Sequence, residues 1–142
     1  MYRRSTGRVI AVTPNFFRVE VKIPISYKNK NYVGTIFGGS LFSATDPIYM
    51  VQLIQILGRD YVVWDKSSMV KFKRPASSDA YAVFAFTEDE INQLKADISE
   101  KKEVDLVKPV LLTNKEGKLF CEIEKVIYVA DKEYYKEKKR GK

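Results

Sequence analysis

Apolar and polar residues alternate along several segments of this chain, and the alternation predicts β-strands. In residues 16–25 every second side chain is apolar and most of the others are charged, the pattern of a strand with one buried and one solvated face. Strand-like runs also occupy residues 7–13, 61–74, 80–86, 104–113 and 118–129. The pattern therefore predicts six strands.

Residues 34–58 have a different pattern, with apolar side chains pointing in nearly every direction if the segment is helical. A helix that is apolar most of the way round is buried, so we expect a central helix. Polar residues interrupt the segment, and we do not expect it to span a membrane. The segment contains one carboxylate, Asp46, whose charge is costly there unless it has a partner or faces a cleft.

A second, shorter helix is expected after the fourth strand. Thr87 and Glu90 have the spacing of a capping box, and the apolar residues that follow share one helical face as far as about Lys101. Strands that flank one buried helix indicate an α+β fold with an antiparallel sheet wrapped around one long central helix. We expect residues 1–142 to form a single domain.

The composition limits the chemistry that is possible. The 142 residues include no histidine and one cysteine, Cys121, which we expect to be a small buried hydrophobic residue. A Ser-His-Asp triad is excluded, and we expect no metal site and no cofactor. Any general base must be a carboxylate, a lysine, a tyrosine or water.

The charge adds little about partners. The formal net charge is +7, but six of the 25 basic residues lie in the final segment 132–142. We expect residues 131–142 to be a basic, frayed tail. Neither a nucleic-acid-binding motif nor a signal peptide is visible, and one cysteine is typical of a reducing compartment. We therefore expect a cytoplasmic protein that binds neither nucleic acid nor a membrane.

Four short motifs carry a resemblance to a known superfamily. They are residues 37–39 with Asp46, residues 72–76, residues 79–82 and residues 116–118. In this order they resemble motifs of hotdog-fold thioesterases of the phenylacetate-degradation type. The longer segments 31–47 and 61–76 are more similar to an uncharacterised hotdog family, a domain of unknown function.

The resemblance implies a hotdog fold that assembles as a homodimer or a dimer of dimers, with the sheets joined edge to edge. It also implies hydrolysis of acyl-coenzyme A or acyl-carrier thioesters at the dimer interface. Asp46 would be the base or nucleophile, and a backbone N–H of Gly38 or Gly39 would polarise the thioester carbonyl. A helix N-terminus offers free N–H groups, which suit a developing oxyanion.

Other residues are candidates for substrate binding. Phe37 stands where the superfamily has a histidine, and Ser43 shares a helical face with Asp46. Lys71, Lys73 and Arg74 could meet the phosphates of coenzyme A, although a solvated strand face explains them equally well. Asp65 and Lys66 could line a pocket or form a surface ion pair.

Two alternatives remain open from the sequence. Asp46-Pro47 can be a helix cap followed by the first helical residue, or Pro47 can be a kink within one helix that starts at Gly38 or Gly39. The protein can be an acyl-thioesterase that uses Asp46. Because the histidine is missing, it can also be a non-catalytic hotdog module that binds acyl groups or serves as a dimeric scaffold.

Overall fold

The computed structural model describes residues 7–26, Gly34 and 38–141, and it contains one six-stranded antiparallel sheet. The strand order is β1-β2-β4-β5-β6-β3. The strands are β1 (Arg8–Val12), β2 (Arg18–Ile23), β3 (Tyr61–Phe72), β4 (Ala80–Ala85), β5 (Glu103–Thr113) and β6 (Leu119–Asp131). All six strands predicted by the alternating pattern are present, and the α+β hotdog fold is confirmed.

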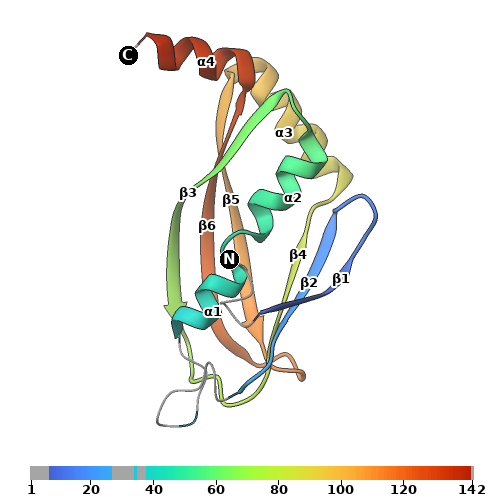
Figure 1. The fold of residues 1–142 in the computed structure, drawn as a ribbon, viewed down its shortest axis with the longest axis vertical. Coiled ribbons are helices and arrows are strands. Elements are labelled where there is room, and N and C mark those ends of the chain that lie inside the picture. The colour runs from blue at the N-terminus through green and yellow to red at the C-terminus, as the bar shows by residue number, and fades with distance from the viewer. Residues whose placement is uncertain (1–6, 27–33, 35–37, 142) are drawn as a thin grey trace.

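The predicted central helix lies across one face of this sheet, but as two helices (Figure 1). Helix α1 spans Gly38–Thr45 and helix α2 spans Ile48–Leu57, and the chain breaks between them at Asp46 and Pro47. The Asp46 N–H still donates to the Phe42 carbonyl at 2.9 Å, whereas proline has no N–H with which to continue the ladder. The break is thus the kink that Pro47 predicts.

The core forms between the helices and the strands, and β6 crosses its centre. The inward residues of β6 include Ile123, Ile127 and Val129, all fully buried, together with Cys121, the small buried residue that the sequence predicts. Helix α2 is fixed to the sheet by buried Gln52, whose amide donates to the carbonyls of Phe16 and Phe84. The break at Asp46-Pro47 lies over β6, the fifth of the six strands in the sheet.

The two remaining helices both lie toward the upper end of the sheet in Figure 1. Helix α3 (Glu88–Lys101) begins at the predicted capping box of Thr87 and Glu90. Helix α4 (Lys132–Arg140) occupies most of the segment that the sequence predicts to fray. Asp131 caps α4, and the Tyr135 ring packs 6.0 Å from the ring of Tyr128 on β6, which gives the tail something to bury against.

Candidate active site at the break between the central helices

Asp46 lies at the break between α1 and α2 and does not cap a helix. The cap position of α2 is occupied by Pro47, with no side-chain cap hydrogen bond in this part of the structure. The alternative in which Asp46 caps the helix is therefore wrong. Its side chain is 43% exposed, and Oδ1 accepts a hydrogen bond of 2.7 Å from the Nζ of Lys125.

Lys125 comes from the core face of β6, between Ile123 and Ile127. Its side chain is only 1% exposed, although lysine is almost never fully buried without a partner. Besides Asp46, its Nζ lies 3.4 Å from Oδ1 of Asp65 and 5.8 Å from the centre of the Phe42 ring. One buried cation thus connects two carboxylates from separate elements.

Asp65 faces inward because it has the same parity in β3 as Tyr61 and Val63, which pack against the core. The pairing of β3 with β6 shifts between Asp65 and Ser67, which leaves Lys66 as an extra residue. Burial raises the pKa of Asp65, and the nearby Asp46 raises it further, against the opposing effect of Lys125. Lys66 instead forms an exposed ion pair of 2.7 Å with Asp105, so Asp65 and Lys66 have separate partners.

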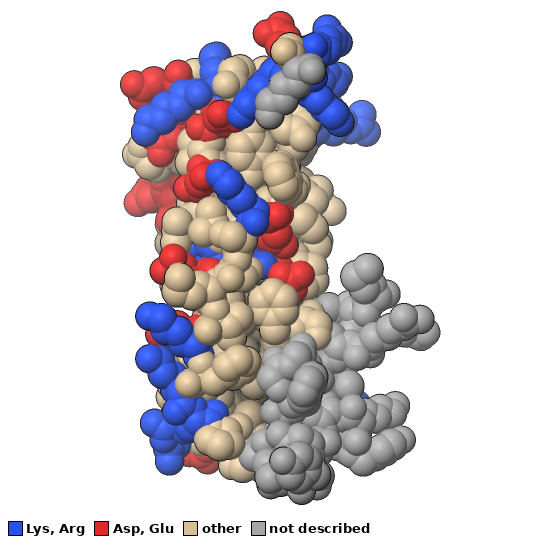
Figure 2. Space-filling view, turned by 90° about the vertical axis from the view of Figure 1, so that its left-hand side faces the viewer, with Lys and Arg blue, Asp and Glu red and all other residues tan. Residues whose placement is uncertain are grey.

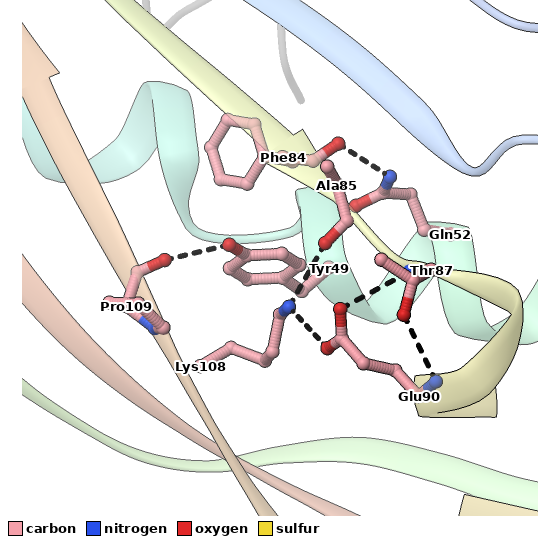
Figure 3. Close-up of polar contacts among 8 residues, drawn as sticks. All are labelled: Tyr49, Gln52, Phe84, Ala85, Thr87, Glu90, Lys108 and Pro109. Atoms are coloured by element: carbon pink, nitrogen blue, oxygen red, sulfur yellow. Dashed lines mark hydrogen bonds and ion pairs between the residues drawn. The ribbon is translucent and has the colours of Figure 1, made fainter. Parts of the chain in front are cut away.

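A second inward lysine lies directly opposite Lys125. Lys108 on β5 pairs with Lys125 across the strands, and its Nζ donates to Glu90 at 2.8 Å and to the Ala85 carbonyl at 2.9 Å (Figure 3). The same ammonium lies over the rings of Phe86 and Tyr49. Burial raises the pKa of Glu90, but the bonds from Lys108 and Thr87 outweigh it, and the net pKa is lowered.

Tyr49, on the first turn of α2, contacts Lys108 with its ring and also lines an apolar cavity. Its hydroxyl donates to the Pro109 carbonyl at 2.7 Å (Figure 3), and burial raises its pKa. Strands β4 and β5 are paired at Tyr81 and Thr113. Beside this pair lies a cavity of about 400 Å³. Its lining includes Tyr49, Ala82, Val83 and Leu111.

The predicted oxyanion donors lie at the far end of α1 from Asp46. Gly38 and Gly39 are the first two residues of that helix. Seven residues separate Gly39 from Asp46, which corresponds to about 10 Å along a helix at a rise of about 1.5 Å per residue. Within one chain, the N–H groups at the start of α1 and the Asp46 carboxylate just after its end are therefore not adjacent.

The three basic residues predicted to bind phosphate, Lys71, Lys73 and Arg74, do not lie beside Asp46. Ser43 is exposed on α1, and Phe37 lies outside the described residues. Lys71 pairs with Glu122 on β6, whereas Lys125 pairs with Ser68, so Lys71 lies about 10 Å farther along the sheet at about 3.3 Å per residue. Lys73 and Arg74 are exposed beyond the end of β3.

Sequence reasoning missed Lys125 and Lys108, although a signal for both was present. In β6 Lys125 has the same parity as Cys121, Ile123, Ile127 and Val129, and in β5 Lys108 has the same parity as Leu106, Val110 and Leu112. Each lysine thus interrupts an otherwise apolar face. A charged residue at such a position indicates a buried ion pair or a functional site.

With this geometry in view, the chain can be compared with known proteins. A model of the family described as a domain of unknown function, DUF4442, matches residues 3–129. The chain belongs to this family. No curated protein sequence matches it.

Several solved structures have a similar fold. A probable thioesterase of unknown function from Pseudomonas aeruginosa has a TM-score of 0.78 and 21% identity, over 91% of this chain and 85% of that one. A protein of unknown function from Chlorobaculum tepidum has a TM-score of 0.73 and 17% identity, over 91% and 85%. A thioesterase from Haemophilus influenzae has a TM-score of 0.64 and 14% identity, over 91% and 81%. At these identities the likeness shows the fold of this DUF4442 member. No helix in the described part of the chain is long and apolar enough to cross a membrane.

Proposed function

We propose that this protein hydrolyses acyl thioesters, of coenzyme A or of an acyl carrier, with Asp46 as the base or nucleophile. The observation that carries the proposal is the Asp46 carboxylate, which has no capping role and remains 43% exposed at a break above β6. A partly exposed carboxylate within an otherwise apolar segment is a candidate general base or nucleophile. The names of the similar structures from Pseudomonas aeruginosa and Haemophilus influenzae support the same reaction class.

The reaction needs an oxyanion donor as well as the carboxylate. Because Gly38 and Gly39 begin α1 about 10 Å from Asp46, one thioester carbonyl cannot reach both within a single chain. We propose that the N–H groups of one protomer and Asp46 of its partner act on the same substrate. Mixing inactive Asp46→Asn with inactive Gly38→Pro should then restore hydrolysis, since one site of the mixed dimer is intact. A mixture that stays inactive contradicts the shared site.

The proposed homodimer joins through the edge strand β3. This strand has 12 residues, and exposed edges of that length are normally covered or paired. Exposed Trp64 and Met69 lie on it, and Figure 2 shows a band of uncharged residues on this side of the molecule. Light scattering should give a dimer or a dimer of dimers, whereas a stable monomer at micromolar concentration would contradict the assembly.

The activity is tested by measuring free thiol release from a panel of acyl-coenzyme A esters. Asp46→Asn should lower hydrolysis by about 10²-fold or more, the usual scale for loss of a general base. Asp105→Asn is a matched control, because Asp105 also pairs with a lysine at 2.7 Å but on the exposed outer face. Equal activity of Asp46→Asn and the wild type would remove Asp46 from the active site.

A second function, a non-catalytic module that binds acyl chains, is favoured by the cavity between β4 and β5. The cavity is about 400 Å³ in volume and is lined mainly by apolar residues, including Val83 and Leu111. A fluorescent fatty acid that binds with equal affinity to the wild type and to Asp46→Asn, together with no thiol release from any ester, would favour this function over hydrolysis.

A further inference from the structure

Lys125 and Asp46 differ sharply in their contact with solvent, although they form one ion pair. The lysine side chain is 1% exposed and lies among fully buried residues of β6, whereas the aspartate side chain is 43% exposed. The ammonium therefore contacts the carboxylate from the core side. It cannot touch a substrate that approaches Asp46 from solvent.

The hydrogen bond distinguishes the two oxygens of the Asp46 carboxylate. Oδ1 is 2.7 Å from the buried ammonium, which leaves Oδ2 as the oxygen available to a water molecule or an acyl carbon. A charge-assisted bond of this length restricts rotation of the carboxylate. This restraint matters at Asp46, because the helix is interrupted at the next residue, Pro47.

We propose that Lys125 is a positioning residue, which holds Oδ1 of Asp46 so that Oδ2 is directed at the substrate. This inference rests on the proposed function and adds a residue to it. Asp65, 3.4 Å from the same ammonium, balances the charge of Lys125 and anchors it between β3 and α1. A misplaced catalytic group can cost about 10²-fold in rate without any loss of substrate contacts.

A structural role for Lys125 predicts different behaviour, and a pair of variants separates the two. Lys125→Met leaves Asp65 buried without a cation, which destabilises the fold whatever the role of the lysine. Adding Asp65→Asn removes the stranded charge and should restore much of the stability. If Lys125 is only structural, the double variant Lys125→Met/Asp65→Asn regains activity together with stability.

If Lys125 positions Asp46, the double variant folds but stays slow. We expect kcat for acyl-coenzyme A hydrolysis to fall by about 10²-fold with KM nearly unchanged, because substrate contacts remain while the attacking oxygen is misdirected. Asp65→Asn alone should keep most of the activity, since Lys125 still holds Asp46. Lys108→Met is the matched control, because it removes the inward lysine directly opposite and leaves the Asp46 pair intact.

The outcomes separate this inference from the function on which it rests. A double variant with the kcat of the wild type, beside an inactive Asp46→Asn, overturns the positioning role and leaves the proposed function in place. A wild type that hydrolyses no ester overturns both. A slow double variant beside an active Lys108→Met supports Lys125 as the residue that aligns Asp46.

Discussion

The two inward lysines occupy equivalent positions on neighbouring strands but have different surroundings. Lys108 is 12% exposed and is bound by Glu90, the Ala85 carbonyl and two aromatic rings, so its partners are parts of the scaffold. Lys125 is more deeply buried and is bound by two carboxylates, one of which faces solvent at the helix break. The ion pair of Lys108 and Glu90 thus joins two elements of the scaffold. The ion pair of Lys125 and Asp46 instead holds a carboxylate that faces solvent.

The difference lies in what each carboxylate does besides forming the ion pair. Glu90 also accepts a hydrogen bond from the Thr87 N–H in the capping box, so both of its oxygens are used by the fold. Asp46 caps nothing, and Oδ2 has no such task in the described part of the structure. An ion pair in a protein core therefore indicates a functional site only when one of its charged groups keeps an atom that no other part of the fold binds.

The largest expected effect is the loss of stability when either lysine is removed. Breaking a fully buried ion pair from one side costs about 3–5 kcal/mol, and Lys125→Met should cost about 3 kcal/mol, at the low end, because the Asp65 side chain that is left behind is 23% exposed. Lys108→Met should cost less, roughly 2 kcal/mol, because Glu90 is half-exposed and only the Ala85 carbonyl loses a buried donor. Urea unfolding measures both, and a larger loss for Lys108→Met would reverse the comparison.

Glu90→Gln tests the ion pair of Lys108, the lysine whose partners belong to the scaffold. Glutamine retains the capping box but not the charge that binds Lys108, so we expect a loss of roughly 1 kcal/mol at neutral pH. The pKa of Glu90 is lowered in the folded protein, so its stabilisation is present above the unfolded value and is lost as the pH falls through the folded pKa. The difference between Glu90→Gln and the wild type should disappear in acid, and a pH-independent difference would contradict the ion pair.

Asp65→Asn should have a smaller effect of the opposite sign. The pKa of Asp65 is raised in the folded protein, so the folded state binds its proton more tightly than the unfolded chain does. Its ionised form therefore lowers the stability at pH values above the folded pKa, and this penalty fades as the pH falls through that value. Thermal unfolding at neutral pH should show a gain of roughly 1 kcal/mol or less, about 2–4 °C for a chain of this size. A clear loss of stability would show that Lys125 needs both carboxylates.

Lys66→Met measures how much an exposed ion pair contributes to stability, for comparison with the pairs of the two inward lysines. Lys66 and Asp105 are 2.7 Å apart, as close as Lys125 and Asp46, but both side chains are about half exposed. Exposed pairs contribute roughly 0–1 kcal/mol, so the free energy of unfolding should change by no more than about 0.5 kcal/mol. A loss comparable to that of Lys125→Met would mean that burial does not distinguish these pairs.

The sequence alone determined most of the scaffold. Alternation and helical periodicity are local patterns, so they predicted the six strands, the central helical segment and the capping box at Thr87. They also singled out Asp46 as a charge in an apolar helix, but they left open whether Pro47 begins a helix or kinks one. The pattern of the tail did not predict helix α4, because Tyr128, the ring against which Tyr135 packs, belongs to β6 and is not visible in the tail itself.

Only the tertiary structure decided what Asp46 touches. Its partner Lys125 lies 79 residues away, on the strand that crosses the centre of the core. The parity of β6 already indicated that Lys125 faces inward, but parity fixes the face of a strand and not its register against other elements. That register, together with the pairing of β3 and β6 that places Asp65 beside Ile127, brings one lysine between two carboxylates. Local patterns assign residues to the core, whereas the meeting of charges within the core depends on how the elements pack.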